Sequence, residues 1–229
     1  MKKLVCIIPV SSFSNSKTRL SPFLSDSERR KLLKVMLKDI VSNIRGQVED
    51  IILVSRDDGV LEYARQLNVS FVKEGEHENN FLNNALLDAI RNVRLNYPNH
   101  DILILPSDIP LVKPEHIESA KNSQTDLVLS PSKGGGTNLL LFNSDFDFIP
   151  LFGDMSYFNH MNEAYTSNMT VNIIESFYLS LDVNTNEDLG EILLHGMNTH
   201  TYEYLSNLNI IVKSSHGQER LDVKRKDEG

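Results

Sequence analysis

Two basic side chains lie close together in a polar segment near the start of the chain. Lys17 and Arg19 are separated by one threonine and stand among small hydroxyl residues, after an apolar segment over residues 4–10. An ammonium and a guanidinium at the end of a buried strand neutralise polyphosphate charge, while backbone amides approach the same anion. This segment is therefore a candidate polyphosphate site. A solvated pair of loop charges is the alternative, because basic residues at this spacing are common.

Side chains with carboxylate or amide oxygens, which could bind a metal ion, follow two further apolar segments. Asp108 stands between Pro106 and Pro110, which fix the local chain. Asp182 and Asn184 lie two positions apart, so alternation along an extended chain places them on one side. Mg²⁺ commonly takes one or two carboxylates together with substrate phosphates and water. The pattern predicts a Mg²⁺ site, and the alternative for Asp108 is an aspartate that caps or closes a turn.

A glycine run and a serine form a third candidate site, for a small anion. Gly134–Gly136 precedes Thr137, and glycines let a backbone approach a ligand closely. Ser156 stands where a helix could begin, and the amides at a helix start favour an anion. A flexible hairpin turn and a simple helix cap are the alternatives. His160 is expected to pack or to face water, because no serine–histidine–acid triad can be assigned.

Two common nucleotide-binding motifs are absent from the sequence. No Gly-x-Gly-x-x-Gly follows the first apolar segment, and no Gly-x-x-x-x-Gly-Lys-Ser/Thr occurs anywhere. These absences disfavour a nicotinamide dehydrogenase and a P-loop phosphohydrolase. A nucleotide, if bound, is held by a different arrangement.

The composition is that of a water-soluble protein with one substantial core. The chain has 229 residues, 40% hydrophobic and 24% charged, with a formal net charge of −8. This balance disfavours nucleic acid and acidic membranes as partners. A single cysteine, Cys6, lies in an apolar run and is expected in the core of a protein in a reducing compartment. No segment approaches the ~18 apolar residues of a membrane span, so a cytoplasmic location is expected.

Strands that alternate with amphipathic helices would position these candidate residues. Leu32, Met36, Ile40 and Ile44 recur at four-residue spacing after a capping pattern at Ser25 and predict the strongest helix. Short apolar segments predict strands, and the periodic segments between them predict helices. The strands are expected at 4–10, 51–54, 69–72 and 102–105, and the further helices at 57–67 and 82–93. The alternation predicts an α/β fold of three layers, with a mainly parallel sheet between helices, and ligands at the carboxyl ends of the strands.

The pattern is less regular in the second half of the chain. A helix is expected at 114–120, strands at 127–129, 171–174 and 179–183, and a further helix after a capping pattern at Thr185. We expect one domain over residues 1–213. Residues 214–229 are rich in charge without an evident apolar face and are expected to form a mobile tail.

Taken together and in this order, these segments resemble the 2-phospho-L-lactate guanylyltransferase family of coenzyme F(420) biosynthesis. The similarity runs from Ile8 to Asp188. It is carried by the residues at 17–22, 105–111, 134–138, 152–156 and 181–188. The family implies a Rossmann-like fold of the nucleotide-diphospho-sugar-transferase and molybdopterin-guanylyltransferase type.

The resemblance also implies an activity and a role for each site residue. GMP would pass from GTP to 2-phospho-L-lactate, giving lactyl-2-diphospho-5'-guanosine and pyrophosphate; related members accept phosphoenolpyruvate or 3-phosphoglycerate. Lys17, Arg19 and Asp108 would be catalytic and would bind the nucleotide together with Pro9, Val10 and Asn83. The acceptor would lie against Gly135, Gly136, Thr137, Gly153 and Ser156. Asp108, Asp182 and Asn184 would hold Mg²⁺, and the family suggests a homodimer.

Three residues depart from the family pattern. Ser11 stands where a lysine is usual, Phe81 where a glycine is usual, and Asn184 where a second metal-binding aspartate is usual. An amide oxygen can still ligate Mg²⁺. The alternatives are another nucleotidyltransferase, with a molybdopterin or sugar phosphate acceptor, and a nucleotide-binding module without turnover.

Overall fold

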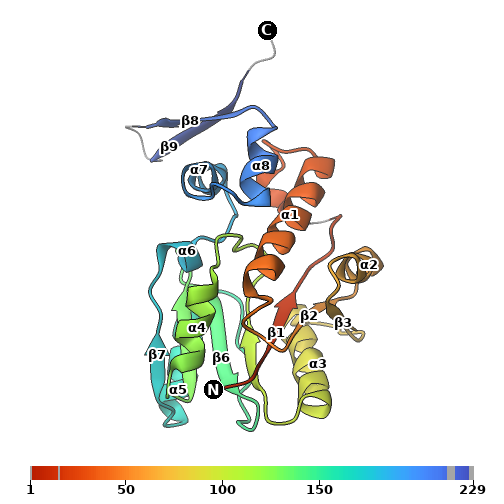
Figure 1. Ribbon diagram of the computed structural model, residues 1–229, viewed down its shortest axis with the longest axis vertical. Helices are drawn as coiled ribbons and strands as arrows, with labels where there is room; N and C mark the ends of the chain where they lie inside the picture. The colour runs from red at the N-terminus through yellow and green to blue at the C-terminus, as the bar shows by residue number, and fades with distance from the viewer. Residues whose placement is uncertain (1, 15, 216–219, 227–229) are drawn as a thin grey trace.

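A seven-stranded sheet forms the centre of the protein (Figure 1). The computed structural model describes residues 2–14, 16–215 and 220–226. From one edge to the other the strands are β3 (Ser70–Lys73), β2 (Asp50–Ser55), β1 (Leu4–Pro9), β4 (Asp101–Ile104), β6 (Thr137–Asn143), β5 (Leu127–Pro131) and β7 (Val171–Ile173). Among the described residues of this sheet, only the β4–β6 and β5–β6 pairings are antiparallel. The sheet is therefore mainly parallel, as predicted.

The first strand shows why the sheet must be covered on both faces. Leu4, Cys6 and Ile8 belong to one cluster of buried side chains, and Val5 and Ile7 belong to another. Because side chains alternate along a strand, an apolar residue at every position requires a hydrophobic layer on each face. The prediction that Cys6 lies in the core is confirmed.

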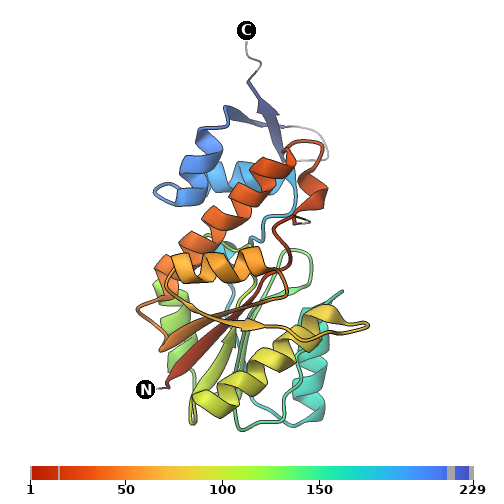
Figure 2. The same cartoon turned by 90° about the vertical axis from the view of Figure 1, so that its right-hand side faces the viewer.

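Helices supply these two layers (Figures 1 and 2). One face is covered by α1 (Asp26–Ile44), α2 (Asp58–Gln66) and α4 (Pro114–Asn122), and the other by α3 (Phe81–Asn96) and α5 (Ser156–Thr166). The N-terminus of α1 has the predicted capping box, in which Ser25 and Glu28 bond to each other's backbone amides. The predicted three-layer α/β fold is confirmed.

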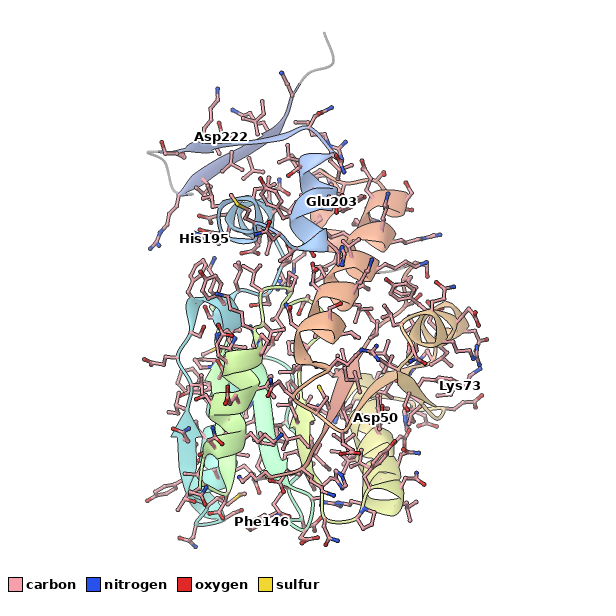
Figure 3. The ribbon with its side chains drawn as sticks, in the orientation of Figure 1. Asp50, Lys73, Phe146, His195, Glu203 and Asp222 are labelled. Carbon is pink, nitrogen blue, oxygen red and sulfur yellow. The ribbon has the colours of Figure 1, made fainter. Side chains whose placement is uncertain are left out.

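The chain from Phe177 onward extends the molecule beyond one end of the sheet (Figures 1 and 3). It contains α6 (Phe177–Ser180), α7 (Asn186–His195), α8 (His200–Ser206), β8 (Ile210–Ser214) and β9 (Leu221–Arg225). Asp39 of α1 accepts hydrogen bonds from the amides of His200 and Thr201, each at 2.8 Å. These bonds satisfy amides at the start of α8 and attach it to α1.

The strand predicted at 179–183 is wrong. Residues up to Ser180 form α6, and the extended residues that follow belong to no sheet. Leu181 and Val183 are buried, so the apolar alternation was correctly read. The Val183 amide donates to the carbonyl of Asp108 at 3.0 Å, and this contact brings residues 182–184 beside the loop that follows β4. The sequence analysis also missed β6, which completes a hairpin with β5.

The C-terminal segment differs from the expected mobile charged tail. Leu221 and Val223 of β9 pack on α7, where a Cβ atom added to Gly190 would lie 2.8 Å from Val223. This small residue allows the β8–β9 hairpin to approach the helix closely. The remainder of the predicted tail, residues 216–219 and 227–229, lies outside the described residues. The single domain over 1–213 stays a prediction.

Within the described ranges, the structure has no helix of the length and apolar character that crossing a bilayer requires.

Candidate active site

A largely apolar cavity of about 480 Å³ opens at the carboxyl ends of the central strands. Val10, Val54 and Ala85 form buried parts of its wall, and the exposed ring of Phe81 forms another part. Open parallel sheets bind ligands at this end, and apolar walls suit a flat aromatic group such as a nucleobase. Pro9 and Val10, predicted to bind the nucleotide, line this cavity, and their role stays a prediction.

A smaller, polar cavity of about 200 Å³ adjoins the first. The two cavities share Ser11, Ser107 and Asp108 in their walls. The remaining wall of the polar cavity is formed by Ser16, Lys17, Thr18, Arg19, Leu33 and Asn184. A ligand with an aromatic part and an anionic part could therefore lie across both cavities, with Asp108 at their junction.

Lys17 links the loop after β1 to the carboxylate at the junction. It precedes the short 3-10 helix η1 (Thr18–Leu20) and has a φ of 54°, which is unfavourable for a residue with a side chain. Its ammonium contacts Asp108 and donates to the Asn184 amide oxygen at 3.2 Å. The side chain is only 10% exposed. The loop thus directs a cation into the site from a left-handed backbone conformation.

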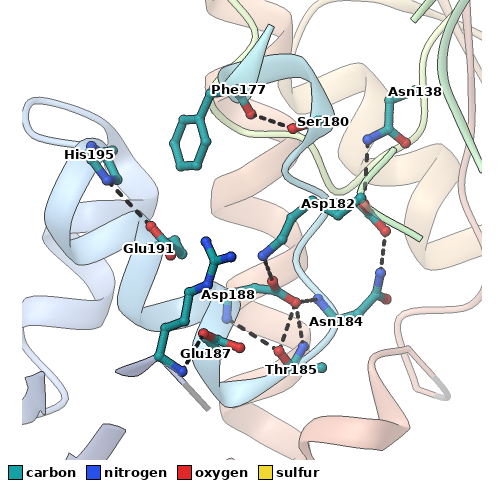
Figure 4. A network of polar contacts seen from close by, with 12 residues as sticks. Asn138, Phe177, Ser180, Asp182, Asn184, Thr185, Glu187, Asp188, Glu191 and His195 are labelled. Carbon is teal, nitrogen blue, oxygen red and sulfur yellow. Dashed lines mark hydrogen bonds and ion pairs between the residues drawn. The ribbon is translucent and has the colours of Figure 1, made fainter. Parts of the chain in front are cut away.

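The extended segment after α6 continues this network (Figure 4). The Asn184 amide nitrogen donates to Asp182, and Asn138 donates to the other Asp182 oxygen at 3.4 Å. The predicted pairing of Asp182 and Asn184 on one side of the chain is therefore seen. Lys17, Asp108, Asn184 and Asp182 form one connected set of side chains, although they come from three separate segments.

The two carboxylates of this set influence each other. Burial raises the pKa of Asp182, and the negative charge of Asp108 raises it further. A hydrogen bond from Asn138 and the ammonium of Lys17 act in the opposite direction. Two acids that share one ammonium in a partly buried site favour the approach of further positive charge.

The donor set is compatible with Mg²⁺. Asp108, Asp182 and Asn184 offer two carboxylates and one amide oxygen, all of the hard oxygen type that Mg²⁺ prefers. Among the residues that the structure describes, no group of three or more His, Cys, Asp or Glu side chains is placed as a metal cage. An ion here would need substrate phosphates and water to complete its coordination, as Mg²⁺ sites commonly do.

Buried polar contacts hold both ends of the loop that carries Lys17. Arg29 of α1 donates to the Ser16 carbonyl at 3.3 Å and to the Leu24 carbonyl at 2.8 Å. At the other end, Asp57 accepts from the Ser12 hydroxyl at 2.6 Å. Burial acts to raise the pKa of Asp57, but the hydrogen bonds that it accepts together lower it. The anionic form therefore stabilises this loop.

Arg19 lies at the mouth of the polar cavity. Its side chain is exposed and forms no hydrogen bond or ion pair with any other described residue. The guanidinium is therefore available to an anion that enters the cavity. Its predicted role in binding a triphosphate fits this position and stays a prediction.

Asn83 lies behind the apolar cavity and does not line it. Its amide nitrogen donates to the Phe152 carbonyl at 2.9 Å, and its oxygen accepts from the Phe152 amide at 2.8 Å. The side chain is buried, and Phe152 does line the cavity. In this structure Asn83 positions a wall residue, and its predicted contact with the nucleotide stays a prediction.

Two residues predicted to bind the acceptor, Thr137 and Ser156, are bonded to each other. Ser156 donates to the Thr137 hydroxyl at 3.2 Å, and His160 lies 2.9 Å from the same oxygen. The other ring nitrogen of His160 accepts from the Leu151 amide at 2.8 Å, which confirms that this histidine packs in the interior. Because both hydroxyls are buried, a ligand would have to replace this bond to reach them.

The glycines of the predicted acceptor site form a turn on the start of α5. Gly135 has a φ of +79°, and its carbonyl accepts from the Tyr157 amide at 3.2 Å. A Cβ atom at this position would lie 2.9 Å from the sulfur of Met155. Gly136 donates to Ser132, and Gly153 has a φ of +137°. The structure thus brings Gly135, Gly136, Thr137 and Ser156 together, and none of the five predicted residues lines either cavity described above.

Sequence reasoning missed several residues that line the apolar cavity. Arg56 and Glu74, which follow β2 and β3 directly, are two of them. Phe81, already noted as a departure from the family pattern, begins α3 and lines the same cavity. Ser107 precedes Asp108 and touches both cavities. The rule that singled out Asp108, a polar residue just after a buried strand, also fits Arg56 and Glu74 and could have found them.

A second polar cluster lies beside the candidate metal ligands (Figure 4). Asp188 accepts from the amides of Asn184 and Thr185, at 2.9 and 2.8 Å, and caps α7. Its other oxygen lies 3.3 Å from the ammonium of Lys133 in the β5–β6 turn. This cluster connects the glycine turn to the segment that carries Asp182.

Comparison with solved structures identifies the fold. A protein from Desulfovibrio desulfuricans G20 that is described as a nucleotide-diphospho-sugar transferase superposes with a TM-score of 0.75, covering 90% of this chain and 95% of that protein, at 18% identity. A nucleotidyl transferase from Methanothermobacter gives a TM-score of 0.60 at 16% identity, over 85% and 98% of the two chains. At these identities the comparison shows a shared fold.

Comparison of sequences identifies the family. The chain is 61% identical to the 2-phospho-L-lactate guanylyltransferase of Methanosphaera stadtmanae, over the whole length of both proteins. The family described as "Guanylyl transferase CofC like" matches residues 4–226. The match includes both cavities and the polar network between them. This chain therefore belongs to the CofC-like family of guanylyl transferases.

Proposed function

We propose that this protein transfers GMP from GTP to 2-phospho-L-lactate, giving lactyl-2-diphospho-5'-guanosine and pyrophosphate. The proposal follows from family membership and from the 61% identity to a protein of that name. It places the guanosine in the apolar cavity and the triphosphate in the polar cavity.

The observation that carries the proposal is the position of Asp108 where the two cavities meet. Asp108, together with Ser11 and Ser107, belongs to the walls of both an apolar space of about 480 Å³ and a polar space of about 200 Å³ that is lined by Lys17 and Arg19. The α-phosphate of a nucleotide lies between its nucleoside and its outer phosphates. A nucleotide across both cavities would therefore present its reacting phosphorus near Asp108.

The chemistry requires little from the protein beyond positioning. The acceptor phosphate has a second pKa of about 6, so near neutral pH it is largely a dianion and needs no strong base. One of its oxygens attacks the α-phosphorus and forms a new P–O bond. The bond to the bridging oxygen of pyrophosphate breaks, and its electron pair leaves with pyrophosphate. Lys17 and Arg19 would neutralise the charge of this leaving group.

Mg²⁺ is part of the proposal, held by Asp108, Asp182 and Asn184. When bound, the ion would neutralise phosphate charge and polarise the α-phosphate. The raised pKa of Asp182 and the hard oxygen donors support this assignment.

The proposal also covers the acceptor site, the oligomeric state and the cellular location of the protein. Thr137, Ser156 and the neighbouring glycines would receive the phosphorylated acid, with the Ser156–Thr137 bond opening toward it. The family resemblance supports a homodimer, and use of GTP supports a cytoplasmic setting. Light scattering of the purified protein would measure the molar mass and test the dimer.

The deciding experiment is incubation of the protein with GTP, Mg²⁺ and 2-phospho-L-lactate, with product identified by mass. Phosphoenolpyruvate, 3-phosphoglycerate and a sugar phosphate serve as acceptor alternatives, and ATP, CTP and UTP as donor alternatives. Pyrophosphate release that requires both substrates supports transfer. Nucleotide binding without release, for every acceptor tested, would instead identify a binding module.

A further inference from the structure

Two charged side chains stand at the rim of the apolar cavity, at the ends of neighbouring strands. Arg56 directly follows β2 and Glu74 directly follows β3. Val54 and Val72 face each other in the parallel register of these strands and belong to the layer beneath α3. Because side chains alternate, residues two positions further on point to the same face. Arg56 and Glu74 are therefore both directed toward the cavity and toward α3.

Their contacts leave hydrogen-bonding capacity free. The Nε of Arg56 donates to one oxygen of Glu74. No other side-chain hydrogen bond joins either group to the described part of the chain. Each carboxylate oxygen has two acceptor sites, so the second Glu74 oxygen, the remaining site on the first and the two terminal nitrogens of Arg56 are available to a ligand. The Glu74 side chain is only 9% exposed, so its carboxylate is largely withdrawn from water although it lines the cavity.

An aromatic ring lies below the guanidinium. The carbon at the centre of the Arg56 guanidinium is 4.7 Å from the centre of the Phe81 ring. Phe81 is 49% exposed and lines the same cavity. A cation–π contact at this distance restricts the movement of the guanidinium. The pair is thus more ordered than an isolated surface ion pair.

The donors and acceptors of this pair match one purine. Guanine presents two adjacent N–H donors, at N1 and N2, and a neighbouring acceptor at O6. A carboxylate accepts from both donors, and a guanidinium donates to O6. Adenine has an unprotonated N1, whose lone pair would face the carboxylate. The arrangement therefore favours guanine and disfavours adenine.

We propose that Glu74 reads the N1 and N2 donors of guanine and that Arg56 donates to its O6, so that this pair sets the base preference of the protein. This inference rests on the proposed function, because it takes the apolar cavity to be the nucleoside site. Phe81 has a positioning role through Arg56.

The test compares GTP with ITP, which lacks only the 2-amino group. Calorimetry with the full chain, at fixed Mg²⁺ and ionic strength, measures the dissociation constant of each nucleotide. We expect the wild-type protein to bind ITP at least about tenfold more weakly than GTP, because one Glu74 oxygen loses its donor. ATP should bind more weakly than ITP.

Substitutions test whether Glu74 recognises the 2-amino group of the base and whether Arg56 recognises its O6. Glu74→Gln replaces one acceptor by an NH₂ donor, so GTP affinity should fall about tenfold and the GTP-to-ITP ratio should approach one. Arg56→Lys should weaken the binding of GTP and of ITP by a similar factor, since both bases carry O6. The ratio of their dissociation constants should therefore stay the same. Glu78→Gln is the matched control, because Glu78 is exposed and outside the cavity wall.

The outcomes separate this inference from the proposed function. Equal wild-type binding of GTP and ITP would overturn the role of Glu74, and this measurement needs no variant to fold. An unchanged GTP-to-ITP ratio in a folded Glu74→Gln protein would do the same. Either result is compatible with GMP transfer. A preference for GTP over ITP that depends on Glu74, without formation of a guanylylated product from any acceptor, would support the base site and refute GMP transfer.

Discussion

The stability of the protein should fall steeply below pH 6.5 because of His160. This side chain is fully buried, and one ring nitrogen accepts a hydrogen bond from the Leu151 amide. The other nitrogen lies against the Thr137 hydroxyl, so the neutral ring donates there. Burial lowers the pKa of His160 to about 4 from its ordinary value of 6.5. Protonation would remove the acceptor and place a charge in the interior.

The size and sign of the effect follow from these two pKa values. Between pH 6.5 and pH 4 the unfolded chain binds a proton at His160 and the folded protein does not. The stabilisation is therefore complete above pH 6.5 and is lost as the pH falls toward 4. Linkage gives a loss of about 2 kcal/mol between pH 8 and pH 5, which is a large fraction of a typical net stability.

Urea unfolding at several pH values between 5 and 8 measures this loss. The comparison protein is His160→Gln, whose neutral amide can accept from Leu151 and donate to Thr137 but cannot titrate. His116 must remain in both proteins, because burial lowers its pKa as well and adds a loss in the same direction. Between pH 8 and pH 5, the free energy of unfolding of the variant should fall by about 2 kcal/mol less than that of the wild type. Equal pH dependence in the two proteins would refute the argument.

Three further predictions concern the candidate active site. Asp108→Asn should reduce the rate of pyrophosphate release about a thousandfold, because the substitution weakens a metal ligand. The melting temperature should stay near that of the wild type, because the side-chain volume is unchanged. Near-normal turnover would show that Asp108 is not part of the active site. Arg19→Ala should raise the KM for GTP more than that for the acceptor, and the reverse order would contradict its assignment. Asn184→Asp should lower the Mg²⁺ concentration for half-maximal turnover, by an amount corresponding to roughly 1 kcal/mol, and should destabilise the protein in EDTA. Identical Mg²⁺ titrations would show that residue 184 does not face the ion.

The sheet was predictable where burial on both faces leaves a continuous apolar run. Residues 4–10 and 102–105 are such runs, and both form central strands. The segment at 179–183 alternates apolar and polar residues instead, and no strand in the described part of the chain pairs with it. Alternation reports which side chains are buried. Whether an extended segment joins a ladder depends on a partner elsewhere in the chain, and local sequence does not contain that information.

The candidate site was predictable to the extent that strand ends determine it. Asp108 and Lys17 lie at the carboxyl ends of adjacent strands, and parallel pairing brings these ends together. Asn83 was assigned from the resemblance alone, and the structure shows both ends of its amide bonded to Phe152. Such a role depends on a contact between residues 69 positions apart, which no local pattern reveals.

The amide at position 184 explains how the site accommodates its departure from the family pattern. Its oxygen accepts from Lys17 while its nitrogen donates to Asp182, so one side chain joins an ammonium to a carboxylate. An aspartate could accept from Lys17 but would face Asp182 with a second negative charge. Because Lys17 also contacts Asp108, a change at any of these four residues alters the partners of the others. Their substitutions should therefore be non-additive, because the loop that carries Lys17 and the candidate metal ligands form one coupled unit.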